Sequence, residues 1–161
     1  MGRHVYGTAR VLQLSTARPR RRAVAQAAGG SGMSLMMVLE IESGVTLDDV
    51  AFTLRSLGLP SDVDQNIWAG LLPGCRCAFG FKQHAVPLAL GARGMQVEWS
   101  VGLTVTFHFR AAHMLRSLHE IYRLIEVFAM QHRYRFVLSF QYERIYAVRD
   151  ETGLDLVWKI S

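Results

Sequence analysis

Hydrophobic and polar side chains alternate along residues 97–110, and this is the clearest pattern in the chain. Apolar residues occupy the odd positions from Val97 to Phe109, while polar residues and Gly102 occupy the even positions. A period of two predicts an antiparallel strand with one buried face. The run is longer than most strands, so we expect Gly102 to mark a bulge or a bend.

The period becomes helical elsewhere in the chain. Apolar side chains recur every three or four residues between 111 and 131, which predicts a long amphipathic helix. A shorter helix is predicted after Thr46, an N-cap residue, and it ends near Gly58. We also predict a third, short amphipathic helix over residues 61–71.

Short apolar or alternating runs bounded by turn residues predict the other strands. They cover residues 35–41, 75–81, 134–140, 145–149 and 154–160, with a loop over 82–94. The order β-α-α-β-β-α-β-β-β, with hairpins between most strands, predicts an α+β fold. We expect a two-layer sandwich of the split β-α-β type. In it, two main helices cover one face of a mainly antiparallel sheet, and a hairpin is added at the C-terminus.

The distribution of charge divides the chain of 161 residues near Met33. Residues 1–32 contain six of the 18 basic residues, no acidic residue, and a flexible Gly-Gly-Ser-Gly end. The remaining 12 basic residues are balanced by 13 acidic ones. We therefore expect a disordered basic tail or upstream extension over 1–32 and a single domain over 33–161. That domain lacks the basic surface of a nucleic-acid binder.

Two further features indicate the cellular environment. No apolar run reaches the roughly 18 residues that a membrane span needs. The two cysteines, Cys75 and Cys77, lie too close together for a common disulfide and have no other cysteine to pair with. We expect a reducing, cytoplasmic location and no membrane binding. Arg outnumbers Lys by sixteen to two, a bias associated with GC-rich bacterial genes.

The patterns that carry catalysis or bind cofactors are missing from the sequence. The segment 91–94, Gly-Ala-Arg-Gly, has neither the Lys-Ser/Thr of a P-loop nor the spacing of a dinucleotide-binding turn. A Cys-x-Cys pair alone is a weak zinc signature. Alternation places Cys77 on a buried face and His108 on the other, which argues against a Cys–His pair. We expect no catalytic residue, no metal and no cofactor, and hence no enzyme.

Acidic residues gather in two places. Residues 40–64 hold six acids and one Arg, and a second group surrounds the last predicted hairpin. Acidic surfaces steer basic partners, although carboxylates at helix starts are also common because they favour the helix dipole. Trp68 is either an aromatic anchor in a binding surface or a core residue. The residues that we expect to contact a protein partner are Asp48, Asp49, Asp62, Asp64, Trp68, Glu143, Asp150 and Glu151.

The C-terminal half resembles a known class of proteins. The long strand, the helix and the run FQYERIYAVRDETG at 140–153 resemble the C-terminal meanders of small bacterial immunity proteins. Such proteins bind and block a polymorphic toxin. The resemblance concerns the architecture of residues 33–161 and includes no diagnostic motif. It implies a cytoplasmic, non-catalytic domain with a charged face.

Two functions are therefore open. The first is a non-enzymatic protein-binding module, an immunity protein that occludes the active site of a basic toxin domain. The alternative is a ferredoxin-like small-molecule-binding or regulatory domain that acts as a homodimer, with its pocket between the sheet and residues 82–94. Charge reversal at the acidic helix starts distinguishes them, because it removes partner binding and leaves a pocket at the sheet intact.

Overall fold

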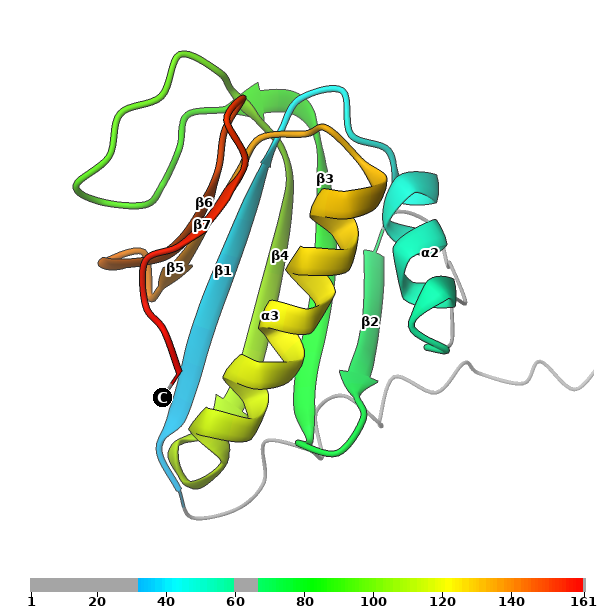
Figure 1. Ribbon diagram of the computed structural model, residues 1–161, viewed down its shortest axis with the longest axis vertical. Coiled ribbons are helices and arrows are strands. Elements are labelled where there is room, and N and C mark those ends of the chain that lie inside the picture. The colour runs from blue at the N-terminus through cyan, green and yellow to red at the C-terminus, as the bar shows by residue number, and fades with distance from the viewer. Residues whose placement is uncertain (1–31, 60–66, 161) are drawn as a thin grey trace, which may run out of the picture.

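A computed structural model describes residues 32–59 and 67–160. Seven strands form one antiparallel sheet in the order β2-β3-β4-β1-β5-β6-β7, and both α-helices lie against one of its faces (Figure 1). The predicted two-layer α+β sandwich is confirmed. The elements are β1 (Ser34–Glu42), α2 (Leu47–Ser56), β2 (Ile67–Leu72), β3 (Cys77–Leu88), β4 (Val101–Arg110), the 3-10 turn η1 (Ala111–His113), α3 (Met114–Gln131), β5 (Phe136–Phe140), β6 (Arg144–Arg149) and β7 (Leu154–Leu156).

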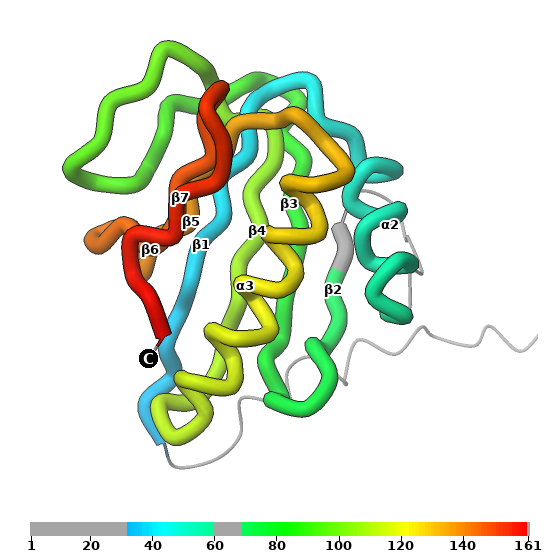
Figure 2. The backbone as a smooth tube through the Cα atoms, in the orientation of Figure 1, coloured from blue at the N-terminus to red at the C-terminus, as the bar shows by residue number. Residues whose placement is uncertain are grey.

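The central strand β1 explains the topology. It lies between β4 and β5, and both run antiparallel to it. The strands β4 and β5 are therefore parallel to each other, and α3 connects them. Because β1 lies between these two strands, this is the predicted split β-α-β arrangement. The strands β6 and β7 extend the sheet on one side, while β3 and β2 extend it on the other (Figure 2).

The main core fills the space between the sheet and the helices. Alternate residues of β1 and β4 face α3, whose buried stripe includes Leu118, Ile121 and Ile125. Each fully buried large apolar side chain contributes roughly 1.5–3 kcal/mol. This layer is therefore the main source of stability. We call the opposite face of the sheet the outer face, and neither α-helix covers it. No helix in the described part of the chain is long and apolar enough to cross a membrane.

Gly102 forms the predicted bulge. Ile41 pairs with Leu103 and Glu42 pairs with Val101, so Gly102 is an extra residue in β4. A Cβ at Gly102 would lie 2.6 Å from the Cα of Ser43. Only glycine fits at this point, because the neighbouring backbone cannot move aside as a side chain can.

The prediction of a helix over 61–71 is wrong for its described part. Residues 67–72 form β2, which pairs with Cys77–Lys82 of β3. A short apolar run is compatible with either a helix or a strand. Here the hydrogen bonds to β3 select the strand. In this pairing Gly70 lies opposite Phe79, and a Cβ at Gly70 would lie 2.6 Å from the Phe79 ring. Residues 61–66 lie outside the described ranges.

Several strand boundaries also differ from the prediction. The strand predicted over 97–110 begins at Val101, and β3 continues to Leu88 through part of the predicted loop. β7 ends at Leu156, although the following residues stay beside β6. There the N–H of Trp158 donates to the carbonyl of Tyr146 at 3.2 Å. Tertiary contacts set these ends, and local periodicity does not report them.

Candidate functional site

Five carboxylates gather at the end of the sheet where β1 finishes, α2 starts and β6 turns into β7. We call this group the acidic edge; it comprises Glu42, Asp48, Asp49, Asp150 and Glu151. The connection between α3 and β5, residues 132–135, runs through the same region and contacts three of the five. Segments that are distant in sequence therefore meet here.

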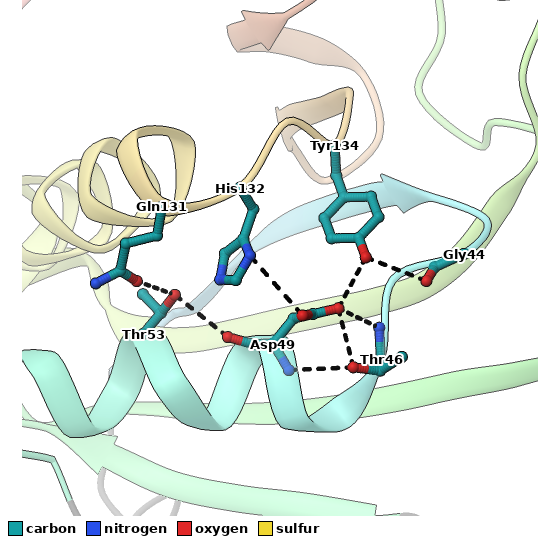
Figure 3. A network of polar contacts seen from close by, with 7 residues as sticks. All are labelled: Gly44, Thr46, Asp49, Thr53, Gln131, His132 and Tyr134. Carbon is teal, nitrogen blue, oxygen red and sulfur yellow. Dashed lines mark hydrogen bonds and ion pairs between the residues drawn. The ribbon is translucent and has the colours of Figure 1, made fainter.

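Asp49 is held by three hydrogen-bond donors (Figure 3). Its Oδ2 accepts from the N–H of Thr46, the hydroxyl of Thr46 and the hydroxyl of Tyr134, each at 2.9 Å. The N–H of Asp49 donates to the Thr46 hydroxyl at 3.2 Å, which completes a capping box at the start of α2. Asp49 therefore joins α2 to the α3–β5 connection, and its carboxylate is already occupied.

Electrostatics favour the ionised form of Asp49. Burial acts to raise the pKa of this carboxyl, but the hydrogen bonds from Thr46 and Tyr134 and the charge of His132 outweigh burial, so the pKa is lowered. The same contact acts on Tyr134, whose pKa is raised by burial and by its bond to Asp49. His132 Nδ1 lies 3.8 Å from Asp49 Oδ1, and its Nε2 is buried without a hydrogen-bond partner in the described structure.

Arg135 links two more carboxylates. Its N–H and its Nε each donate to Glu42 at 2.7 Å, and its Nη1 donates to Glu151 at 2.8 Å. The carboxylate of Glu42 is mostly buried, whereas the side chain of Glu151 is 73% exposed. The Glu42 contacts fix the edge of the sheet, and Glu151 stays accessible to a partner.

Asp48 and Asp150 complete the acidic edge. Asp48 is exposed in the first turn of α2, and its side chain has no hydrogen bond or ion pair within the described ranges. Asp150 Oδ1 accepts from the N–H and hydroxyl of Thr152 and from the N–H of Gly153, which fixes the β6–β7 turn. These bonds lower the pKa of Asp150.

The other predicted partner residues do not join this group. Glu143 lies in the β5–β6 turn at the opposite end of β6, about 20 Å along the strand. Its carboxylate is 3.9 Å from Arg93, and both side chains are exposed. Grouping Glu143 with Asp150 and Glu151 was therefore wrong. Trp68 belongs to β2, not to a helix; its side chain, like Asp62 and Asp64, falls outside what the structure describes.

Glu40 is a polar residue that the sequence analysis did not single out. It lies on the outer face of β1 with 4% of its surface exposed. Its Oε1 accepts from the N–H of Gly91 at 2.7 Å, and its Oε2 accepts from the N–H of Ala92 at 3.0 Å. Burial raises its pKa, and these two bonds partly oppose the shift. The sequence offered one indication of this contact, an acidic residue in a predicted strand that is otherwise apolar.

Both cysteines lie in the main core. Cys75 and Cys77 are both buried and unpaired, and burial raises the pKa of the Cys77 thiol. His108 is exposed on the outer face, so it does not approach Cys77, as the alternation predicted. Among the residues that the structure describes, no three His, Cys, Asp or Glu side chains are placed to hold a metal ion.

Comparison with known proteins adds no relative. No protein-family model matches the chain, and neither curated proteins nor solved structures give a significant match.

Proposed function

We propose that this chain is a non-enzymatic, cytoplasmic protein-binding module that contacts a basic partner through its acidic edge. The observation that supports the proposal is the way the edge is built. Asp49 and Glu42 are fixed by Tyr134 and Arg135, while Asp48 and Glu151 present their carboxylates to solvent. A surface that is ordered before binding loses less conformational entropy when the partner arrives.

Electrostatics favour a basic partner. The acidic edge carries five carboxylates, and the arginines of the same region are Arg133, Arg135 and Arg149. The excess negative charge would accelerate encounter with a positive surface and disfavour acidic competitors. Glu42, Asp49 and Asp150 are held by hydrogen bonds within the fold, whereas the side chains of Asp48 and Glu151 are exposed. We therefore expect Asp48 and Glu151 to have the largest effect on association.

The class of partner that we propose is a bacterial toxin domain. In this proposal the chain is an immunity protein, and it inhibits the toxin by covering its active site. The charged edge on a small α+β domain supports this proposal, as does the resemblance of the strand–helix–meander segment to immunity proteins. Occlusion needs no catalytic group on the inhibitor, only a rigid complementary surface.

The test is affinity capture by the full-length chain from the organism that encodes it. The double variant Asp48→Lys/Glu151→Lys reverses the two exposed charges of the edge. The matched control, Glu98→Lys/Glu126→Lys, makes the same change in charge at two exposed acids outside the edge. We expect one stoichiometric basic partner with the native chain and the control, and none with the edge variant. Co-expression should then protect cells from that partner, and equal capture by all three proteins would refute the proposal.

The outer face of the sheet favours the second candidate function, a homodimeric ferredoxin-like regulatory domain. Leu71, Ala78, His108 and Met36 form one row across β2, β3, β4 and β1 on this face. Leu71 is 53% exposed, and the neighbouring residues Ala69 and Gly80 are small enough for a second sheet to approach closely. Sedimentation equilibrium tests this candidate: a mass that doubles with concentration supports it, and a constant monomer mass excludes it.

A further inference from the structure

A segment on the outer face is fastened to the sheet by one carboxylate. Residues 89–100 connect β3 to β4, and we call them the strap (Figure 2). The strap returns over the outer face, where Gly91 and Ala92 each donate one backbone N–H to Glu40. The N–H of Arg93 donates to the carbonyl of Tyr142 at 2.7 Å, so the next residue is tied to the β5–β6 turn.

The contact between the strap and Glu40 leaves no spare space. A Cβ added at Gly91 would lie 2.9 Å from the Tyr142 ring and 3.0 Å from Glu40 Oε1. Tyr142 itself has a left-handed backbone with φ of 62°, as has Gln141 with φ of 50°. Such values are uncommon for residues other than glycine. The β5–β6 turn is therefore shaped to place the Tyr142 ring against Gly91.

Four buried apolar residues lie outside the main core, and we refer to them together as the outer-face cluster. Val38, Val137 and Val101 are at most 1% exposed, and Ala92 of the strap is 4% exposed. None of the four belongs to the main core between sheet and helices. Val38 and Val137 lie on the outer face beside Glu40, because they alternate with core residues of β1 and β5. These side chains are therefore buried on a face of the sheet that neither α-helix covers.

We propose that the strap is a lid over the outer-face cluster, that Glu40 is its latch, and that ionisation of Glu40 loosens the latch. The proposal is independent of the function assigned to the acidic edge. With the lid closed, the carboxylate has lost its water and has only two N–H groups in exchange. With the lid open, water solvates the charge, so the ionised form favours opening.

The groups around Glu40 leave this direction unchanged. Tyr142 faces it from the β5–β6 turn, and the pKa of Tyr142 is itself raised by burial and by the charge of Glu40. Thr104 is the cross-strand neighbour on β4 and is bonded to His84 of β3 at 2.8 Å. Lys82 of β3 is the cross-strand partner of Thr104, so Thr104 lies between Lys82 and Glu40. On the other side, Val137 of β5 is the cross-strand partner of Glu40.

The sign of the pH dependence follows from these contacts. The ordinary pKa of a glutamate side chain is 4.5, and burial raises the pKa of Glu40 in the closed structure. Protonated Glu40 therefore favours the closed strap, and opening increases as pH rises from 4.5 through the raised pKa. For each pH unit between these two pKa values, the equilibrium constant for opening of the strap increases about tenfold.

Amide hydrogen exchange of the full-length chain, followed by NMR, tests the proposal. The amides of Gly91 and Ala92 should lose protection as pH rises, after correction for intrinsic exchange rates, while amides of β1 and β4 stay protected. In Glu40→Gln this pH dependence should vanish, since the side chain cannot ionise. Glu98→Gln removes an exposed charge from the same strap and should behave as the native chain.

A second variant tests the lid without a change in charge. Gly91→Ala places a methyl group against Tyr142 and Glu40, so the amide of Ala92 should lose protection at every pH while β1 keeps its own. The proposal fails if the amides of Gly91 and Ala92 exchange only when the core amides also exchange, that is, through unfolding of the whole domain. It also fails if Glu40→Gln keeps the native pH dependence, or if Gly91→Ala leaves Ala92 fully protected.

Discussion

Replacement of Asp49 by Ala is the most informative stability experiment, because it separates a structural carboxylate from its exposed neighbour Asp48. The substitution removes the acceptor for two donors of Thr46 and for the Tyr134 hydroxyl. It also removes the bond that ties α2 to the α3–β5 connection. Asp48→Ala removes a charge from the same helical turn but no hydrogen bond within the described structure.

The expected magnitude follows from these contacts. The Thr46 hydroxyl can still accept from the N–H of residue 49, but loss of the carboxylate removes the other half of the capping box, which costs roughly 1 kcal/mol. The bond from Tyr134 to a charged acceptor adds about 1.5 kcal/mol, the lower end of its range, because the Asp49 side chain is 25% exposed. We therefore expect Asp49→Ala to lower the free energy of unfolding by about 2–3 kcal/mol. Asp48→Ala should cost roughly 0.5 kcal/mol through the helix dipole.

Urea unfolding followed by circular dichroism measures both values, and pH provides an internal check. A lowered pKa means that ionised Asp49 stabilises the fold above its ordinary pKa of 3.8. This contribution is lost as pH falls through the lowered value. The difference between native chain and Asp49→Ala should therefore be largest near neutral pH and shrink in acid. Equal destabilisation by Asp48→Ala and Asp49→Ala, or a difference that does not change with pH, would refute this account.

Three further substitutions, the first with an exposed neighbour as its control, test the fold by the same unfolding measurement. Phe107→Ala empties a fully buried site and should cost about 3–5 kcal/mol, while the adjacent exposed His108→Ala should change stability by less than about 0.5 kcal/mol. Gly102→Ala forces a Cβ to within 2.6 Å of backbone and should cost about 1–3 kcal/mol; an unchanged midpoint would contradict the bulge. Tyr122→Phe removes a donor to the carbonyl of Trp158 and should cost about 1 kcal/mol. In the native chain, burial raises the pKa of Tyr122 to about 12, so ultraviolet titration should find it unionised at pH 10.

Local patterns were sufficient for much of the fold. The alternation that predicted a strand ending at Arg110 and the helical stripe that predicted α3 each reflect one buried face, and burial of that face is what the sheet and helix require. Gly102 was found for the same reason, since a glycine in a long alternating run has a backbone explanation. β2 was missed because its residues become a strand only through pairing with β3, which lies outside any local window.

The candidate site was less accessible from sequence. Thr46 was predicted as an N-cap, but its capping box with Asp49, although a local motif, was not recognised, and Asp49 was predicted to contact a partner. The contacts of Asp49 with Tyr134 and of Glu42 with Arg135 connect residues more than 80 positions apart. Asp150 and Glu151 were correctly associated with a hairpin turn, but Glu143 was not separable from them until β6 was placed between them.

The most direct test of the central claim is a calorimetric titration of the captured partner with the native chain, Asp48→Lys/Glu151→Lys and Glu98→Lys/Glu126→Lys at two salt concentrations. If the acidic edge binds the partner, the edge variant should lose at least about tenfold in affinity. The control should stay within about twofold, and higher salt should weaken the native complex. Equal affinities for all three proteins would contradict the account and place the binding surface elsewhere on the domain.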